Sequence, residues 1–460
     1  MPGMSLRDIV RVLDAEYIGD EGALDESVRS VTMDSRTVTE GALFFAIRGE
    51  RVDGHSFIGD VFNKGALAVI CERDTSDAGN RIVVKHSIAA LQRLAAYYRT
   101  CVDAKVVLIT GSVGKTSTKE MIASVLGEKY NVLKTEGNFN NEIGLPLTVF
   151  RLRPEHEVAV LEAGVDEPGE MDIIAKAAKP DVCVITNIGI CHMENLGSRR
   201  GIFEEKSKCF DYMRDGGIAV LNGDDDILGS VRDVRGVSPV FFGVDRVGEY
   251  VDKQVYVTDV VSKGFDGSDA VLHTGAGNIN VSVGIPGVHQ ITNAAAAAAV
   301  GLGLGLSLSQ IASGIAKAKT ISGRTNLIHT DKLLIVDDCY NANPSSMKAG
   351  LFLLVKASGR RIAVLGDMGE LGPDERALHR EVGEYAAGLG LDALFLCGEL
   401  SKEIMEGAKA DKNLMIRHFP DREKLTEELL KYVQEGDTVL VKASHFMQYQ
   451  AIVDALTKYV

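Results

Sequence analysis

Residues 106–120 read VVLITGSVGKTSTKE and place a glycine-rich turn between an apolar strand and the start of a helix. Gly111 and Gly114 let backbone N–H groups turn inward on a polyphosphate. The Lys115 ammonium can then reach the β and γ oxygens, and the Thr116 hydroxyl can ligate magnesium. A simple glycine turn before a helix is the alternative, but the strand–turn–helix context favours a nucleoside triphosphate site.

The loop is a shortened form of the usual phosphate-binding motif, because Ile109 stands where a glycine six residues before the lysine would be expected. Residues 106–109 are uniformly apolar, which predicts a parallel strand buried on both faces. We expect the nucleotide to contact the whole loop: Gly111, Ser112, Val113, Gly114, Lys115, Thr116 and Ser117.

Length, charge and cysteine content narrow the class of protein. The 460 residues exceed what one hydrophobic core usually serves, and the net charge of -14 argues against nucleic-acid or anionic-membrane partners. Seven cysteines without a C-x-x-C pair are typical of reduced thiols, and the first residues do not resemble a signal peptide. The most apolar run, residues 294–306, is too short to span a bilayer. We therefore expect a cytoplasmic protein without membrane insertion.

Apolar strand candidates alternate with helix-length intervals along most of the chain, which predicts an α/β protein of three domains. Residues 1–103 are expected to form a small N-terminal α/β domain. Residues 104–322 are expected to form a central, P-loop-type, doubly wound and mostly parallel sheet. Residues 323–460 are expected to form a Rossmann-like α/β domain.

Polar residues follow two of the predicted central strands, where ligands of open α/β sheets gather. Glu162 directly follows the strand at residues 158–161, and His192 lies shortly after the strand at residues 182–186. Both could ligate magnesium beside the phosphate loop. A helix-dipole role is the alternative for Glu162. Zinc is disfavoured because the Cys191–His192 pair lacks further ligands.

Motifs spread over nearly the whole chain resemble the Mur ligases, the ATP-dependent amide ligases of peptidoglycan synthesis. The resemblance rests on the motif TGSVGKTSTKE, the pairs Gly137-Asn138 and Asn140-Asn141, and TNIGICHMENLGS at residues 186–198. VDDCYNANP at residues 336–344 and VLGDMGELG at residues 364–372 resemble the branch that uses D-alanyl-D-alanine and UDP-N-acetylmuramoyl-tripeptide. The D-N-P-R motif of the diamino-acid-adding relatives is absent.

The resemblance implies roles for individual residues of this chain. Lys115 and Thr116 would serve ATP and magnesium, and Glu162, His192 and Lys206 would be further metal ligands. Asn293 would contact adenine, and Arg324 and Asn341 would approach the nucleotide from the last domain, together with Asp338. The catalytic group is then expected to comprise Lys115, Lys206, His192 and Asp338.

Two asparagines also have simpler explanations as helix caps. Asn293 could be the N-cap of the alanine-rich helix that follows it, and this is compatible with a nucleotide contact. Asn343 precedes Pro344, and an N-cap followed by proline at the first helical position explains this pair.

The resemblance also implies that Lys206 carries a carbamate, formed with carbon dioxide, that ligates magnesium. The surrounding run is Glu204-Glu205-Lys206-Ser207-Lys208, whereas the family usually has alanine before this lysine and an acidic or neutral residue two positions after it. A solvated, charged helix face is the alternative. Because a carbamate requires a neutral amine, Lys208 and the metal would have to lower the pKa of Lys206.

Two further segments bear on substrate binding. Ser35, Arg36, Asp53 and His55 lie in segments that resemble the UDP-binding part of the family, and a turn with a surface ion pair is the alternative. Residues 441–447 read VKASHFM where the family often has Lys-Gly-Ser-Arg, so Ala443 and His445 depart from the pattern.

The implied reaction begins with attack of the tripeptide carboxylate on the γ-phosphate of ATP, and the amine of D-alanyl-D-alanine then displaces phosphate from the acyl phosphate. This reaction would use ATP and magnesium. We expect the protein to be a monomer. Three alternatives stay open at this point: a P-loop kinase, a ligase acting on another carboxylate, and a catalytically silent nucleotide-binding partner.

Overall fold

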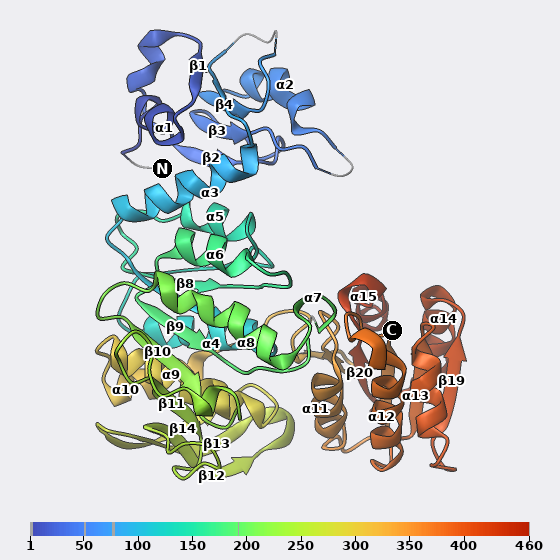
Figure 1. Ribbon diagram of the computed structural model, residues 1–460. Helices are drawn as coiled ribbons and strands as arrows, with labels where there is room; N and C mark the ends of the chain where they lie inside the picture. Colours follow the sequence, from blue (N-terminus) through green and yellow to red (C-terminus); the bar gives the residue numbers. More distant parts are fainter. Residues whose placement is uncertain (1–2, 50–51, 76–78, 192, 460) are drawn as a thin grey trace.

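The computed structural model describes residues 3–49, 52–75, 79–191 and 193–459, and within these ranges the strands form three sheets. Figure 1 shows the three units in chain order, with the blue N-terminal unit at the top, the green and yellow central unit below it, and the orange and red C-terminal unit beside the central one. This three-part α/β architecture confirms the predicted fold class.

The N-terminal sheet has the strand order β1-β5-β4-β3-β2, and β1 alone pairs antiparallel there among the described strands. Its elements are α1 (Leu6–Leu13), β1 (Glu16–Ile18), β2 (Ser30–Thr32), β3 (Ala42–Phe45), α2 (Ile58–Asn63), β4 (Ala68–Cys71), β5 (Arg81–Val83) and α3 (Ser87–Tyr98). Both β3 and β4 are completely buried.

The central sheet has the order β14-β13-β12-β11-β10-β9-β6-β8-β7. Its strands are β6 (Lys105–Thr110), β7 (Val132–Lys134), β8 (Val158–Glu162), β9 (Val182–Ile185), β10 (Ile218–Asn222), β11 (Val240–Val244), β12 (Val255–Ser262), β13 (Ser268–Thr274) and β14 (Gly277–Val283). Its helices are α4 (Lys115–Leu126), α5 (Gly144–Val149), α6 (Glu170–Ala178), α7 (Met193–Leu196), α8 (Arg199–Ser207), α9 (His289–Gly303) and α10 (Leu308–Lys317).

Strand β6 is buried on both faces, as its uniformly apolar sequence predicts. Leu108 belongs to the hydrophobic core shared with α3 and α6, whereas Val107 and Ile109 belong to the core shared with α4 and α9. The phosphate loop follows this strand directly. The loop therefore starts from a strand that is packed on both faces.

The central sheet also contains an antiparallel extension that the sequence analysis did not predict. Strands β12, β13 and β14 form a meander at one edge, with partly exposed outer faces. Such half-exposed strands alternate apolar and polar residues instead of showing a continuous apolar run.

The C-terminal sheet has the order β15-β16-β20-β17-β18-β19, and β15 pairs antiparallel with β16. Its strands are β15 (Asn326–His329), β16 (Leu334–Asp337), β17 (Arg361–Gly366), β18 (Ala393–Cys397), β19 (Met415–Phe419) and β20 (Thr438–Lys442). Its helices are α11 (Pro344–Leu354), α12 (Glu375–Ala387), α13 (Ser401–Ala408), α14 (Arg422–Tyr432) and α15 (Gln450–Thr457). Strand β20 lies between β16 and β17, so the carboxyl ends of these three parallel strands lie side by side at one edge of the sheet.

Helix α3 joins the N-terminal unit to the central one (Figure 1). The Tyr98 hydroxyl donates a hydrogen bond to the Leu152 carbonyl oxygen over 2.7 Å. The Arg99 guanidinium is 2% exposed and donates to the carbonyl oxygen of Ala178 and to the Asp181 carboxylate. In the described part of the chain, no helix combines the length and hydropathy that crossing a bilayer requires.

Candidate nucleotide and magnesium site

The loop between β6 and α4 has the geometry of a phosphate cradle. Gly111 has a φ of +145°, and a Cβ there would lie 2.0 Å from Thr186 Oγ1, so only glycine fits. Gly114 has a φ of +85° and leads into the first turn of α4, whose free N–H groups and dipole favour an anion. The Lys115 ammonium folds back over the loop and donates to the Gly111 carbonyl oxygen over 2.8 Å.

The loop is held in shape by the segment that follows β9. Asn187 Oδ1 accepts the N–H of Val113 over 2.9 Å, and Asn187 Nδ2 donates to the Val113 carbonyl oxygen. The Ser112 hydroxyl accepts the N–H of Gly189 over 2.9 Å. The sequence analysis did not assign Asn187 a role. Its position two residues after the buried strand β9 is the signal that could have identified it.

A carboxylate lies next to the loop at the end of β8. Glu162 Oε1 accepts hydrogen bonds from the Thr116 hydroxyl over 3.1 Å and from Asn140 Nδ2 over 2.9 Å. The second oxygen, Oε2, is buried and receives no hydrogen bond from any described group. A buried carboxylate oxygen without a donor suits a cation, and oxygen ligands of this kind are the ones magnesium prefers.

Lys206 lies in the last turn of α8 and is completely buried, and no described group accepts a hydrogen bond from its Nζ. Burial, reinforced by the nearby Lys115 ammonium, lowers the pKa of Lys206 to about 7. The expectation that Lys208 would lower this pKa is wrong. Its ammonium is occupied by Glu205 and Asp172, and Lys115 supplies the neighbouring positive charge instead.

Arg324 brings a third cation to the same region from the start of the C-terminal unit. Desolvation lowers the pKa of Lys115, and the Arg324 charge adds to this effect, whereas Glu162 opposes it. The Arg324 guanidinium lies 4.1 Å from the centre of the Tyr340 ring, and its buried Nε has no acceptor among the described groups. Ser117 and Arg324 line the same small crevice. The convergence of Lys115, Lys206 and Arg324 favours a polyanionic ligand.

Asn293 lies in the second turn of α9 and is not its N-cap, because the helix begins at His289. The N-cap interpretation of Asn293 is therefore wrong. Its Oδ1 accepts the Thr118 hydroxyl over 3.0 Å and would lie 3.8 Å from a Cβ on Gly114, so the side chain faces the loop.

His192 lies outside the described residues, and its neighbour Cys191 contacts the C-terminal unit. Asn343 Nδ2 donates to Cys191 Sγ over 3.5 Å, while Asn343 Oδ1 accepts the N–H of Ser346 as the N-cap of α11. The N-cap interpretation of Asn343 is confirmed. The same side chain also links the two units beside the nucleotide site.

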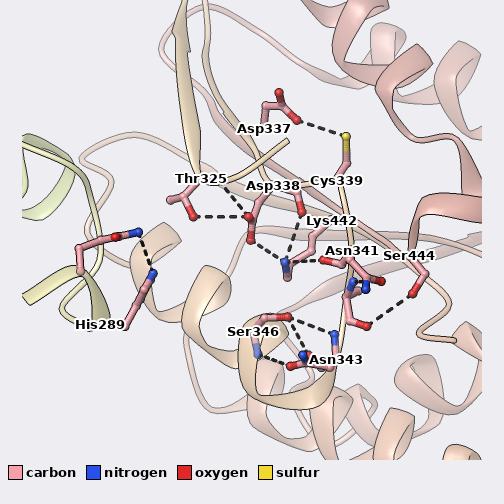
Figure 2. Close-up of polar contacts among 12 residues, drawn as sticks. His289, Thr325, Asp337, Asp338, Cys339, Asn341, Asn343, Ser346, Lys442 and Ser444 are labelled. Carbon is pink, nitrogen blue, oxygen red and sulfur yellow. Dashed lines mark hydrogen bonds and ion pairs between the residues drawn. The ribbon is translucent and has the colours of Figure 1, made fainter. Parts of the chain in front are cut away.

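Figure 2 shows that Asp338, at the carboxyl end of β16, is engaged by other residues of the C-terminal unit. Lys442, which is 2% exposed, donates to Asp338 Oδ2 over 2.6 Å and to the Asn341 carbonyl oxygen over 3.0 Å. Asp338 Oδ1 accepts the N–H of Thr325 over 2.9 Å. Ser444 lies at the edge of this group. The interactions tie the segment after β16 to the end of β20.

The GDMGELG segment after β17 is also firmly held. The N–H of Met368 donates to His379 Nε2 over 2.8 Å, and the N–H of Gly369 donates to the Ser444 hydroxyl over 2.9 Å. His379 is completely buried, and burial lowers its pKa. The sequence analysis did not assign a role to His379 because a lone histidine within a helix carries no motif. Glu370, which follows Gly369, has a φ of +61°, which is uncommon for a residue other than glycine.

The four residues expected to bind UDP lie in the N-terminal unit, apart from the nucleotide loop (Figure 1). The exposed Arg36 guanidinium contacts the Asp34 carboxylate over 2.7 Å and holds the pKa of Asp34 at about 2. The Ser35 carbonyl oxygen accepts the Lys64 ammonium over 2.7 Å. The surface ion pair considered in the sequence analysis is thus present.

His55 and Asp53 hold the segment after β3. His55 is 7% exposed, and its Nδ1 lies 2.7 Å from Asp53 Oδ1. Its Nε2 accepts the N–H of Glu72, which assigns the proton to Nδ1. The structure brings Asp53 and His55 together but does not place them beside Lys115.

Comparisons with known proteins agree with this geometry. Sequence patterns of three domains match the chain: the Mur ligase family catalytic domain at residues 27–99, the Mur ligase middle domain at residues 109–301, and the Mur ligase glutamate ligase domain at residues 323–445.

Full-length relatives extend the likeness over the whole chain. UDP-N-acetylmuramoyl-tripeptide--D-alanyl-D-alanine ligase of Bacillus subtilis is 37% identical over 93% of each chain, and the Escherichia coli protein of the same name is 35% identical over 99% of each.

Solved structures show the same arrangement. MurF from Acinetobacter baumannii superimposes with a TM-score of 0.88 and 31% identity over 99% of this chain and 98% of that one. MurF ligase from Thermotoga maritima in complex with ADP gives a TM-score of 0.80 and 33% identity over 94% of this chain and 98% of that one. The chain therefore belongs to the Mur ligase family.

Proposed function

We propose that this protein is an ATP-dependent ligase that joins D-alanyl-D-alanine to the terminal carboxylate of UDP-N-acetylmuramoyl-tripeptide. The observation that carries the proposal is a group of three buried polar atoms around the phosphate loop that have no hydrogen-bond partner among the described residues: Glu162 Oε2, Lys206 Nζ and Arg324 Nε. These atoms suit magnesium and a polyphosphate. Relatives that share the full length of the chain are named as this ligase.

The first step transfers the γ-phosphoryl group to the substrate carboxylate, giving an acyl phosphate and ADP. The chain's contribution is positioning and neutralisation of charge, because no covalent bond to the protein forms. The α4 N-terminus and Lys115 hold the phosphates. Thr116, Glu162 and His192 would hold magnesium, which neutralises phosphate charge when bound. Asn293 is assigned to the adenine.

The second step forms the amide bond. The amine nitrogen of D-alanyl-D-alanine attacks the acyl carbon, the C–O bond to phosphate breaks, and the nitrogen loses a proton. Water must be excluded from the acyl phosphate. We assign this exclusion to approach of the C-terminal unit, with Arg324 and Asn341 next to the nucleotide. Both oxygens of Asp338 are engaged by Lys442 and Thr325, so we assign Asp338 a positioning role.

Lys206 fits the proposed carbamate. A neutral lysine nitrogen attacks carbon dioxide, an N–C bond forms, and one proton leaves. Complete burial, the absence of an acceptor among the described groups and a pKa of about 7 are the properties that this reaction requires of a lysine. The resulting carboxylate would supply an oxygen ligand for magnesium.

We assign UDP recognition to the N-terminal unit, within residues 1–103, where Arg36 and Ser35 can meet a diphosphate once the Asp34 ion pair opens. Asp53 and His55 would fix the neighbouring segment. The nucleotide and the amine would be handled by residues 104–322 and 323–460. Because ATP and UDP-linked sugars are cytoplasmic metabolites, we propose that the enzyme acts there.

The test is phosphate release from ATP by the purified protein, followed together with the mass of the peptide product. We expect release that requires both UDP-N-acetylmuramoyl-tripeptide and D-alanyl-D-alanine and that matches product formation. Glu162→Gln should raise the magnesium concentration needed for half-maximal rate, because it removes a ligand charge. No release with either substrate would contradict the proposal and favour another carboxylate substrate or a silent nucleotide-binding role.

A further inference from the structure

Lys206 lies in the last turn of α8, and the charged residues next to it have distinct environments. Glu205 is 4% exposed, and its Oε1 accepts the N–H groups of Gly169 over 3.0 Å and Met171 over 2.9 Å. These N–H groups belong to the start of α6, where the helix dipole favours a carboxylate. The end of α8 is therefore attached to the beginning of α6.

Lys208 completes this attachment. Its ammonium donates to Glu205 Oε2 over 2.8 Å and lies 3.0 Å from Asp172 Oδ2 in the first turn of α6. Both oxygens of the Glu205 carboxylate are thus used, one by α6 and the other by Lys208. We call Glu205, Lys208 and Asp172 the α8 anchor.

The neighbouring Glu204 shows what the same residue type does without such an attachment. Its carboxylate pairs with Arg200 on the surface of α8, and both side chains are more than 60% exposed. The solvated face considered in the sequence analysis therefore applies to Glu204 and not to Glu205. Glu204 provides a matched control on the same helix.

We propose that the α8 anchor is a positioning device that directs Lys206 into the nucleotide site. Successive residues point about 100° apart around a helix, so fixing Glu205 against α6 also fixes the direction of Lys206. The Lys115 ammonium on the phosphate loop is close enough to Lys206 for its charge to lower the pKa of Lys206. Glu205 and Lys208 thereby provide support behind a metal-binding residue.

The proposal rests on the assigned role of Lys206 in magnesium binding, and it predicts a specific kinetic change. Loss of residues that orient a metal ligand typically costs about 10–100-fold in metal affinity or activity. Glu205→Ala and Lys208→Met should therefore raise the magnesium concentration for half-maximal rate at least about tenfold. Glu205→Gln should lose less, because its amide oxygen can still accept from α6.

The experiment measures magnesium dependence of the full-length ligase together with two further properties of each variant. Thermal unfolding reports how much of the enzyme is folded, and rates are expressed per folded enzyme. Carbon-13 NMR after equilibration with labelled bicarbonate reports a carbamate signal. A purely structural role for Glu205 would lower the unfolding temperature while leaving the magnesium dependence and the signal per folded enzyme unchanged.

We expect Glu205→Ala and Lys208→Met to need more magnesium for half-maximal rate and to give a weaker carbamate signal. Glu205→Gln should show smaller changes in both properties. Glu204→Ala should behave like the wild type. Folded Glu205→Ala with wild-type magnesium dependence would refute the anchor. If Glu205→Ala does not fold, wild-type magnesium dependence in both Glu205→Gln and Lys208→Met would refute it instead.

Lys206→Ala separates the two proposals. An inactive Lys206→Ala beside a fully active Glu205→Ala refutes only the anchor. Full activity of Lys206→Ala refutes the role of Lys206 and the anchor together.

Discussion

Replacing Lys206 with methionine should stabilise the ligand-free protein while abolishing ligation. The side chain is completely buried, and its pKa falls from 10.5 to about 7. Between these two pH values the unfolded chain binds more protons than the folded one, so stability rises with pH. The cost of burying Lys206 is therefore full below pH 7 and disappears as the pH approaches 10.5.

The size of the effect follows from the pKa shift. A change from 10.5 to about 7 corresponds to about 5 kcal/mol at low pH. Because the folded protein loses the Lys206 proton above pH 7 while the unfolded chain keeps it, the cost falls to about 4 kcal/mol at pH 7 and about 2 kcal/mol at pH 9. Methionine has a similar unbranched shape and carries no charge, so it avoids the cost at both pH values. The difference in free energy of unfolding between Lys206→Met and the wild type should thus decrease by about 2 kcal/mol from pH 7 to pH 9.

The assay is urea unfolding at pH 7 and pH 9, with carbon dioxide removed so that Lys206 stays unmodified. Lys176→Met is the control, because Lys176 is exposed on α6. Comparing each variant with wild type at the same pH removes the contribution of other titrating groups. A Lys206→Met protein less stable than wild type at pH 7, or a difference that does not decrease at pH 9, would refute the reasoning.

Three other substitutions test separate parts of the structure. Lys115→Ala should abolish ADP release with an unchanged unfolding temperature, because Lys115 is the half-buried first residue of α4 and is not one of the core residues of the central unit; full activity would contradict the P-loop assignment. Arg99→Met removes the buried donor to the Ala178 carbonyl oxygen, while Asp181 keeps Lys105 as a partner, so the change should cost about 1–3 kcal/mol in urea unfolding; a change within experimental error would show that the α3 junction does not depend on Arg99. His379→Leu removes the acceptor of the Met368 N–H and should raise the KM for D-alanyl-D-alanine more than His379→Gln does; equal values for the two variants would exclude that hydrogen bond as the cause.

The parallel strands could be predicted from sequence because burial on both faces requires an unbroken apolar run, as at residues 106–109. The meander of β12, β13 and β14 was missed for the opposite reason. Its strands have one partly exposed face, and alternation between apolar and polar residues is a weaker signal.

Only part of the nucleotide site could be predicted from the sequence, for a different reason. A phosphate loop is a local motif, so Gly111 and Lys115 could be recognised within one segment. The environments of Glu204 and Glu205 differ because α6 packs against one side of α8 and not the other. That difference depends on tertiary packing between segments remote in sequence, which the charge run alone does not encode.

The place of β20 in the C-terminal sheet has a consequence for the order of assembly. Residues 438–442 pair with β16 on one side and β17 on the other, so the middle of this sheet is filled by the strand that the ribosome makes last among its members. Until then, β16 and β17 have no common neighbour and Asp338 has no Lys442. The unit that is proposed to deliver the amine thus gains its shape only after the nucleotide-binding part has been synthesised.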